Sequence, residues 1–225
     1  MFHYRSATLV HVAGLVSLGA IAFPAPTLAE FTLGPKAGTL GFGLEGSYAF
    51  NDRFGIRAGL NTFDYSWDDD LDGVSYDGDL ELQSTALLLD YRPAANGFRI
   101  SAGILLNGTE INGVADPAAT YDIGENTYTF EESGDLSATA EFDRISPYVG
   151  IGYDFRRESA IRISFDLGVA FQGDPDVSIR TVGGTLSDDS TLRADLDAEE
   201  ASFQSDLEGL DIYPVLSIGI SYAFE

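Results

Sequence analysis

The last eight residues before Glu225 alternate strictly between two kinds of side chain. The apolar members are Ile218, Ile220, Tyr222 and Phe224, and the small or polar members are Ser217, Gly219, Ser221 and Ala223. Because successive side chains of a strand point to opposite faces, a period of two predicts a β-strand with one apolar face. A sheet of such strands must cover its apolar face, and a closed barrel and a soluble sandwich are the two all-β candidates.

Other segments of the chain alternate in the same way and also predict strands. Short polar turns and long polar stretches follow one another between them, an arrangement typical of transmembrane barrels. A soluble sandwich is the alternative, but it would not make every outward face apolar. The seven predicted strands cover residues 39–50, 54–65, 79–91, 98–108, 145–155, 161–171 and 212–224.

The faces predicted to point inward carry charges of both signs. In strand 79–91, we predict an outward face of Leu80, Leu82, Ala86 and Leu88 and an inward face of Glu81, Gln83 and Thr85. The inward charged residues are then Glu45, Arg57, Glu81, Arg99, Arg162 and Asp166. An eight-stranded barrel is just wide enough for side chains to fill, so we expect an ion-pair core. A conducting path is the alternative.

An odd number of strands is a difficulty, because bacterial single-chain barrels close with an even number. Residues 31–36 are the only candidate for an eighth strand. We predict that this strand is short and turns back through residues 34–38, which include Gly34, Pro35 and Gly38.

The final strand resembles the carboxyl-terminal signal of bacterial outer-membrane β-barrels, although Glu225 follows its near-terminal Phe224. The chain as a whole resembles the small eight-stranded barrels that include the OmpA transmembrane domain, OmpX and OmpW. The resemblance implies an all-β fold: an eight-stranded antiparallel up-and-down transmembrane barrel with long outer loops. It also implies outer-membrane lipid and the barrel-assembly machinery as partners. It assigns no functional residues.

The amino terminus is typical of a secretory signal. Arg5 precedes an apolar stretch over residues 7–23, and small residues lead to a cleavage site after Ala29. A membrane-spanning helix is the alternative, but Pro24 and Pro26 follow the stretch closely. We therefore predict a signal peptide over 1–29, a barrel domain over 30–225, and export to the bacterial outer membrane.

Composition excludes several classes of function. Both histidines, His3 and His11, lie in the predicted signal, and the chain has no cysteine. The predicted barrel domain thus lacks the usual general base, nucleophilic thiols and most zinc ligands. A net charge of −24 disfavours nucleic acid as a partner. We predict a protein that is not an enzyme, with carboxylate chemistry on lipid as a remote alternative.

An acidic segment at residues 68–79 resembles a calcium-binding loop. Asp68, Asp70, Asp72 and Asp79 occupy ligand positions 1, 3, 5 and 12 of that pattern, and a glycine stands at position 6. Position 12 normally carries glutamate, and strands rather than helices flank the segment. We therefore predict calcium as a candidate cofactor bound by this segment. The alternative interpretation is a solvated acidic loop that binds no metal.

The last long stretch predicts one short amphipathic helix over residues 190–210. Its apolar stripe comprises Leu192, Leu196, Phe203, Leu207 and Leu210. The leading functional hypothesis is a non-enzymatic outer-membrane protein that supports the envelope or binds an unknown extracellular ligand through its acidic loops. The alternative is a narrow pore or transporter for ions or small apolar solutes.

Overall fold

The computed structural model describes residues 30–71, 74–94, 96–115, 117, 120–124, 126–156, 160–207 and 209–224. The predicted signal peptide lies outside these residues and stays a prediction. No helix within the described ranges is both long and apolar enough to cross a membrane.

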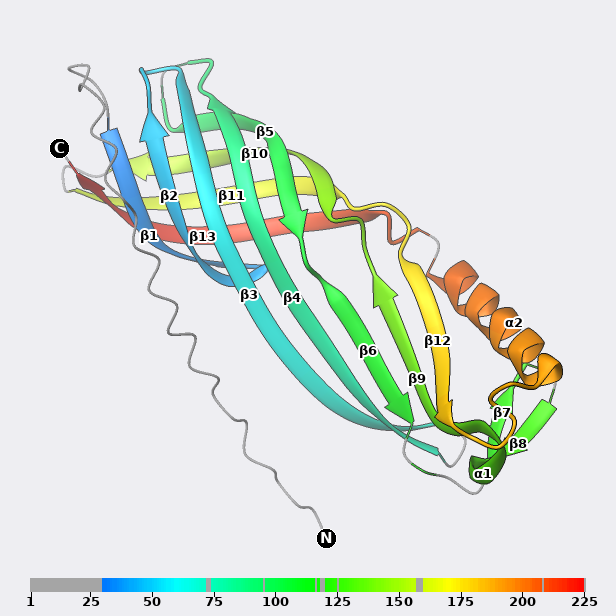
Figure 1. Cartoon of the computed structure of the whole chain (residues 1–225). Helices are drawn as coiled ribbons and strands as arrows, with labels where there is room; N and C mark the ends of the chain where they lie inside the picture. Colours follow the sequence, from blue (N-terminus) through cyan, green and yellow to red (C-terminus); the bar gives the residue numbers. More distant parts are fainter. Residues whose placement is uncertain are drawn as a thin grey trace, which may run out of the picture.

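Eight strands close into an antiparallel barrel. They are β1 (Glu30–Gly38), β2 (Gly41–Ala49), β3 (Phe54–Leu71), β4 (Val74–Tyr91), β5 (Phe98–Asn107), β10 (Ile145–Arg156), β11 (Ile161–Phe171) and β13 (Ile212–Phe224). Each pairs with the next in this order, and β13 pairs with β1. The closed ladder confirms the predicted fold class and excludes the sandwich. Two turns, at 50–53 and 92–97, lie at one end of the barrel, where β1 begins and β13 ends (Figure 1). We call this end the turn end.

The first strand is longer than predicted. β1 has nine residues, and the turn is formed by Thr39 and Leu40 instead of residues 34–38. Proline cannot donate to a ladder, and the register between β1 and β13 skips Gly34 and Pro35. The proline therefore sits at a break in the pairing with β13 only, and the strand continues because its pairing with β2 runs through Gly34 and Pro35.

At the far end of the barrel, β3 and β4 continue into a wall that stands to one side (Figure 1). The strands β6 (Glu110–Ala115), β9 (Gly134–Glu141) and β12 (Asp176–Gly183) extend this sheet in the order β3-β4-β6-β9-β12. We use the name wall for these three strands with residues 63–71 of β3 and 74–83 of β4. β6 and β9 fall in one of the long polar stretches, where no membrane-spanning strand was predicted, so most of the wall was not predicted.

The helix α2 (Ser190–Asp206) packs along β12, the last strand of the wall (Figure 1). It ends before the predicted residue 210. At its start, the Asp189 carboxylate accepts hydrogen bonds from the backbone N–H groups of Thr191 and Leu192, which lower the pKa of Asp189. Leu192 is fully buried against the hairpin of β7 (Thr120–Ile123) and β8 (Asn126–Thr129), whose last strand leads into the short α1 (Phe130–Ser133).

A hydrogen bond ties this hairpin to α2. The Tyr128 hydroxyl donates to the Asp195 carboxylate over 2.5 Å, and this bond raises the pKa of Tyr128 to about 12. Further along the helix, Leu196 and Leu207 pack on Val177 and Ile179 of β12. The predicted apolar stripe is thus only partly used, because Phe203 and Leu210 remain exposed.

The polarity of β3 reverses along its length. Near the turn end, its outward side chains are apolar, as at Ile56 and Leu60, and its inward side chains are polar, as at Arg57 and Asn61. In the wall, the outward-facing positions of β3 carry the exposed Asp64 and Asp68. The inward-facing positions there carry Phe63, Tyr65 and Trp67.

The neighbouring strand β4 reverses at the same level. Its outward residues change from Leu89 and Leu87 to Glu81 and Asp79, all of them exposed. Its inward residues include Leu80 and Leu82, which are directly opposite Tyr65 and Phe63. The outside of the sheet is therefore apolar around the barrel and acidic along the wall.

An apolar belt surrounds the barrel. Its exposed aliphatic side chains include Leu33, Leu44, Ile56, Leu60, Leu89, Ile100, Val149, Ile151, Leu167, Leu216, Ile218 and Ile220. Exposed aromatic side chains collect toward the turn end and touch one another in the pairs Phe31–Phe224, Phe54–Tyr91, Tyr153–Phe155 and Tyr222–Phe224. An aliphatic band bordered by aromatic rings is the surface that a lipid bilayer selects.

Candidate functional site

The lumen is filled near the turn end by a layer of charged side chains, which we call the ion-pair layer. Its members are Lys36, Glu45, Arg57, Asp90, Arg92, Arg99, Asp154 and Asp166. Four are cations and four are anions, so the layer is neutral within a strongly acidic protein. Seven strands and the turn after β4 supply these residues, and Ser217 of β13 adds a hydroxyl at 3.5 Å from Asp166.

Arg57 lies at the centre of the layer and is 4% exposed. Its Nε is 2.8 Å from Oδ2 of Asp90, its Nη2 is 3.2 Å from Oδ1 of Asp166, and its Nη1 is 3.2 Å from Oε1 of Glu45. Lys36 approaches the same glutamate, with Nζ at 2.9 Å from Oε2. One guanidinium thus joins carboxylates from β2, β4 and β11 across the lumen.

Arg99 makes a second junction and is 1% exposed. Its Nη2 donates to Oδ1 of Asp166 over 2.8 Å, and its Nη1 contacts Asp154. Asp154 also pairs with Arg92, whose Nη2 is 3.2 Å away. Buried ions require such partners, because an isolated charge away from water is strongly destabilising.

A glycine makes room for this junction. A Cβ added to Gly152 would lie 2.8 Å from both Arg99 Nε and Asp166 Oδ1. The alternating pattern places small residues such as Gly152 on the inward face of the strands. These small residues leave room for the long charged side chains inside the barrel.

The structure brings together four of the six charged residues that were predicted to face inward: Glu45, Arg57, Arg99 and Asp166. Arg162 lies nearer the turn end, where its Nη2 is 3.1 Å from Oε1 of Glu30. Glu81 was wrongly placed, because it is exposed on the outer face of the wall. The whole predicted face of this strand was reversed: Leu80 and Leu82 in the wall, and Ala86 and Leu88 in the barrel, point inward instead of outward.

Four members of the layer were missed by the sequence analysis: Lys36, Asp90, Arg92 and Asp154. Residues 86–89 of β4 are all apolar, so their pattern does not show which side chains point inward and which point outward. The informative signal was Asp90, which shares its parity with Ala86 and Leu88. An acidic residue cannot face hydrocarbon, so it should have fixed the inward face.

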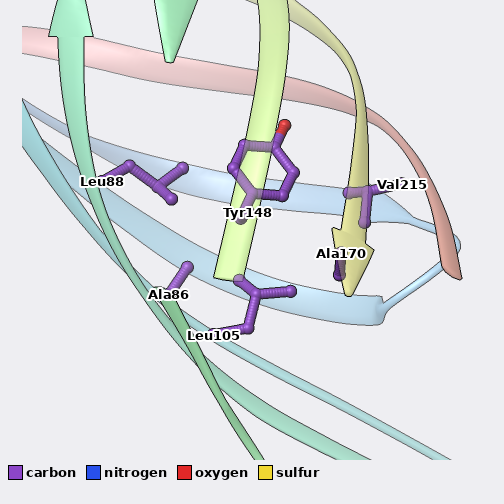
Figure 2. Close-up of a cluster of buried hydrophobic side chains, with 6 residues drawn as sticks. All are labelled: Ala86, Leu88, Leu105, Tyr148, Ala170 and Val215. Atoms are coloured by element: carbon purple, nitrogen blue, oxygen red, sulfur yellow. The ribbon is translucent and has the colours of Figure 1, made fainter. Parts of the chain in front are cut away.

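An apolar layer lies on the far side of the ion pairs. It consists of Ala86, Leu88, Leu105, Tyr148, Ala170 and Val215. Figure 2 shows the Tyr148 ring among the other five side chains inside the barrel. Gly150 and Gly168 provide the space for this ring, since a Cβ on either would lie 2.4 Å from the Tyr148 hydroxyl.

Beyond the apolar layer, the far mouth of the barrel holds a cavity of about 330 Å³, which we call the outer pocket. Leu105 and Ala170 belong to both, so the apolar layer forms the floor of the pocket. The side walls include Leu40, Leu80, Leu82, Ile111, Phe142, Leu210, Ile212 and Tyr213. None of the lining residues is charged.

The residues of the candidate calcium loop lie on two paired strands. Asp68 and Asp70 belong to β3 and Asp79 to β4, where Asp79 is opposite Ser66 and Asp68 is opposite Asp77. Asp72 lies outside the described residues. Within the described part of the chain, no group of three or more potential ligands is arranged to hold a metal ion.

The geometry therefore defines a class: a closed eight-stranded barrel with an occluded lumen and an ordered wall at one mouth. Among solved structures, CarO2 of Acinetobacter baumannii is similar, with a TM-score of 0.56, 24% identity, and coverage of 88% of this chain and 100% of that chain. CarO of the same organism is also similar, with a TM-score of 0.54, 21% identity, and coverage of 86% of this chain and 97% of that chain. The protein thus has the fold of small outer-membrane barrels. No protein-family model and no curated protein matches the sequence.

Proposed function

We propose that this protein is a non-enzymatic integral outer-membrane barrel whose lumen is closed to ion flow and whose wall acts as the binding surface outside the cell. The apolar belt with its aromatic border, and the likeness in fold to CarO2 and CarO, support the location. In this arrangement the turn end faces the periplasm and the wall faces outward. The predicted signal peptide agrees with this route.

The neutral ion-pair layer carries the proposal of a closed lumen. Its guanidinium and carboxylate groups are held together at 2.8–3.2 Å and are almost completely buried. An ion would have to displace these contacts and then cross the apolar layer around Tyr148. Both steps are costly in a narrow barrel.

Planar-bilayer recording tests this function. We expect no steady conductance from the refolded protein, whose folded state is verified by its altered gel mobility before heating. A triple variant, Arg57→Ser, Asp166→Ser and Tyr148→Ala, removes the centre of both layers and should conduct. Steady channels in the unaltered protein would contradict the proposal.

A narrow pore is the second candidate, favoured by voids on both sides of the two layers. A cavity of about 40 Å³, lined in part by Glu30, Arg92 and Arg162, lies on the turn side, and the outer pocket lies opposite. Rearrangement of the ion-pair layer would then connect them. Brief, voltage-dependent openings in the same recordings would favour this candidate.

A further inference from the structure

Three aromatic side chains occupy alternate positions on the inner face of the wall. We call Phe63, Tyr65 and Trp67 the aromatic strip. The rings of Phe63 and Tyr65 lie within 7° of parallel with centroids 6.5 Å apart, and those of Tyr65 and Trp67 within 18° at 6.1 Å. The Trp67 indole lies close against Gly78, where a Cβ would be 2.2 Å from the ring. The strip is thus a row of nearly parallel rings along the sheet, and Tyr65 is 55% exposed.

The aromatic strip leads directly into the outer pocket. Tyr65 is directly opposite Leu80, and Phe63 is directly opposite Leu82. Both leucines line the pocket, whose floor is Leu105 and Ala170. An apolar surface therefore continues from the exposed rings of the wall to the apolar layer that closes the lumen.

The chemistry of this surface selects its ligand. Two of the polar side chains in the pocket are bonded within the protein: Gln172 Nε2 donates to the carbonyl of Leu210 over 2.9 Å, and the Tyr213 hydroxyl donates to the carbonyl of Thr39 over 2.6 Å. Leucine, isoleucine and aromatic side chains form much of the remaining lining, which favours an apolar ligand over a sugar. The acidic residues of β3 and β4 lie on the opposite face of the wall, where they repel anions from the region.

We propose that the aromatic strip and the outer pocket form one site for small, neutral, planar aromatic molecules. The ligand stacks on the strip and then settles in the pocket, against a closed floor. The pocket volume falls in the range of roughly 300–1,000 Å³ that is usual for small-molecule sites. The inference rests on the proposed function, because only an occluded lumen makes the pocket an end point.

Trp67 is the single tryptophan of the chain and reports on this site directly. The full barrel domain is placed in lipid nanodiscs and titrated with N-phenyl-1-naphthylamine, a neutral aromatic dye that accepts energy from tryptophan. We expect saturable quenching of Trp67. Tyr65→Ala should weaken the affinity about tenfold, because it removes one stacking ring and its apolar area. Ser66→Ala, on the opposite face, is the matched control and should leave the affinity unchanged.

A second pair of variants tests the junction with the pocket. Leu82→Gln puts an amide between strip and pocket and should also weaken binding, whereas Gln83→Ala on the outer face should not. Gel mobility before heating verifies that each variant is folded. 8-Anilino-1-naphthalenesulfonate carries the same rings with a negative charge, and it should bind much more weakly.

Two results would overturn the inference. The first is quenching that rises linearly with dye in all variants alike, which is partition into lipid. The second is equal affinity for the anionic dye. Conductance recordings on the same preparations separate the two proposals: a silent barrel without saturable quenching overturns only the binding site, whereas a conducting barrel overturns the closed lumen.

Discussion

The two halves of the β3–β4 hairpin follow opposite rules within the same strands. In the barrel half, apolar residues such as Leu60 and Leu89 point outward and polar residues such as Arg57 point inward. In the wall half, carboxylates point outward and aromatic or leucine side chains point inward. The backbone pairing is continuous through both halves. The difference shows that the surrounding medium, lipid or water, decides the pattern, and that the reversal near Thr62 and Gln83 marks the level at which the medium changes.

The largest effect should come from breaking the ion-pair layer. Asp166→Ala leaves Arg57 and Arg99 with an excess of buried positive charge. We expect the free energy of unfolding to fall by about 3–5 kcal/mol. Asp79→Ala, an acidic residue on the outer face of the wall, is the control and should change it by less than about 0.5 kcal/mol. Urea titration in lipid vesicles measures both, and equal effects would contradict the distinction between lumen and wall.

A charge scan across the reversal should locate the membrane boundary. Leu60→Arg places a cation in the apolar belt and should cost about 2–4 kcal/mol of unfolding free energy. Ser66→Arg has the same parity on the same strand but lies in the wall, so we expect nearly no cost. If both variants unfold at the same urea concentration, the boundary does not lie between them.

A smaller effect should follow from acidifying the cap of α2. The pKa of Asp189 is lowered in the folded protein, so its contribution to stability is present above the ordinary value of 3.8 and is lost as the pH falls through the lowered pKa. Hydrogen-exchange protection at the start of α2 should therefore decrease below about pH 4 while that of the barrel persists. Asp189→Asn keeps a capping side chain without the charge, and it should remove this pH dependence.

Calcium should have the smallest effect. Asp68 and Asp79 are held on paired strands and are not wrapped around one centre, so we expect no heat of binding on titration with micromolar calcium. The variant Asp68→Asn with Asp79→Asn is the control. A saturable signal in the unaltered protein that this variant abolishes would establish the calcium site that the sequence pattern indicates.

The barrel was predictable because its constraint is local. Alternation over residues 217–224 and the inward positions of Arg57 and Asp166 follow from a period of two and a hydrocarbon exterior. Most of the wall was not predicted, since water surrounds it and the polar stretch that holds β6 and β9 gave no clear alternation, whereas Val177 and Ile179 of β12 do alternate with polar residues. Glu81 was misplaced because the face of strand 79–91 was assigned from Leu80 and Leu82, which lie in the wall, and Asp90 was not used. Lys36 was missed because Gly34 and Pro35 resemble a turn, whereas the unbroken register with β2 shows that the strand continues through them.

The ion-pair layer also has a consequence for assembly. Arg57 comes from the third strand of the barrel, β3, and Asp166 from the seventh, β11, so this ion pair forms only when the sheet has curled far enough to bring distant strands together. An open sheet in lipid would hold Arg57 and Asp166 apart: Arg57 would keep Glu45 and Asp90 on the neighbouring strands, but Asp166 would lose this partner. An incomplete barrel, in which such charges lack their partners, is therefore less stable than the closed one. The network that closes the lumen thus also favours completion of the cylinder.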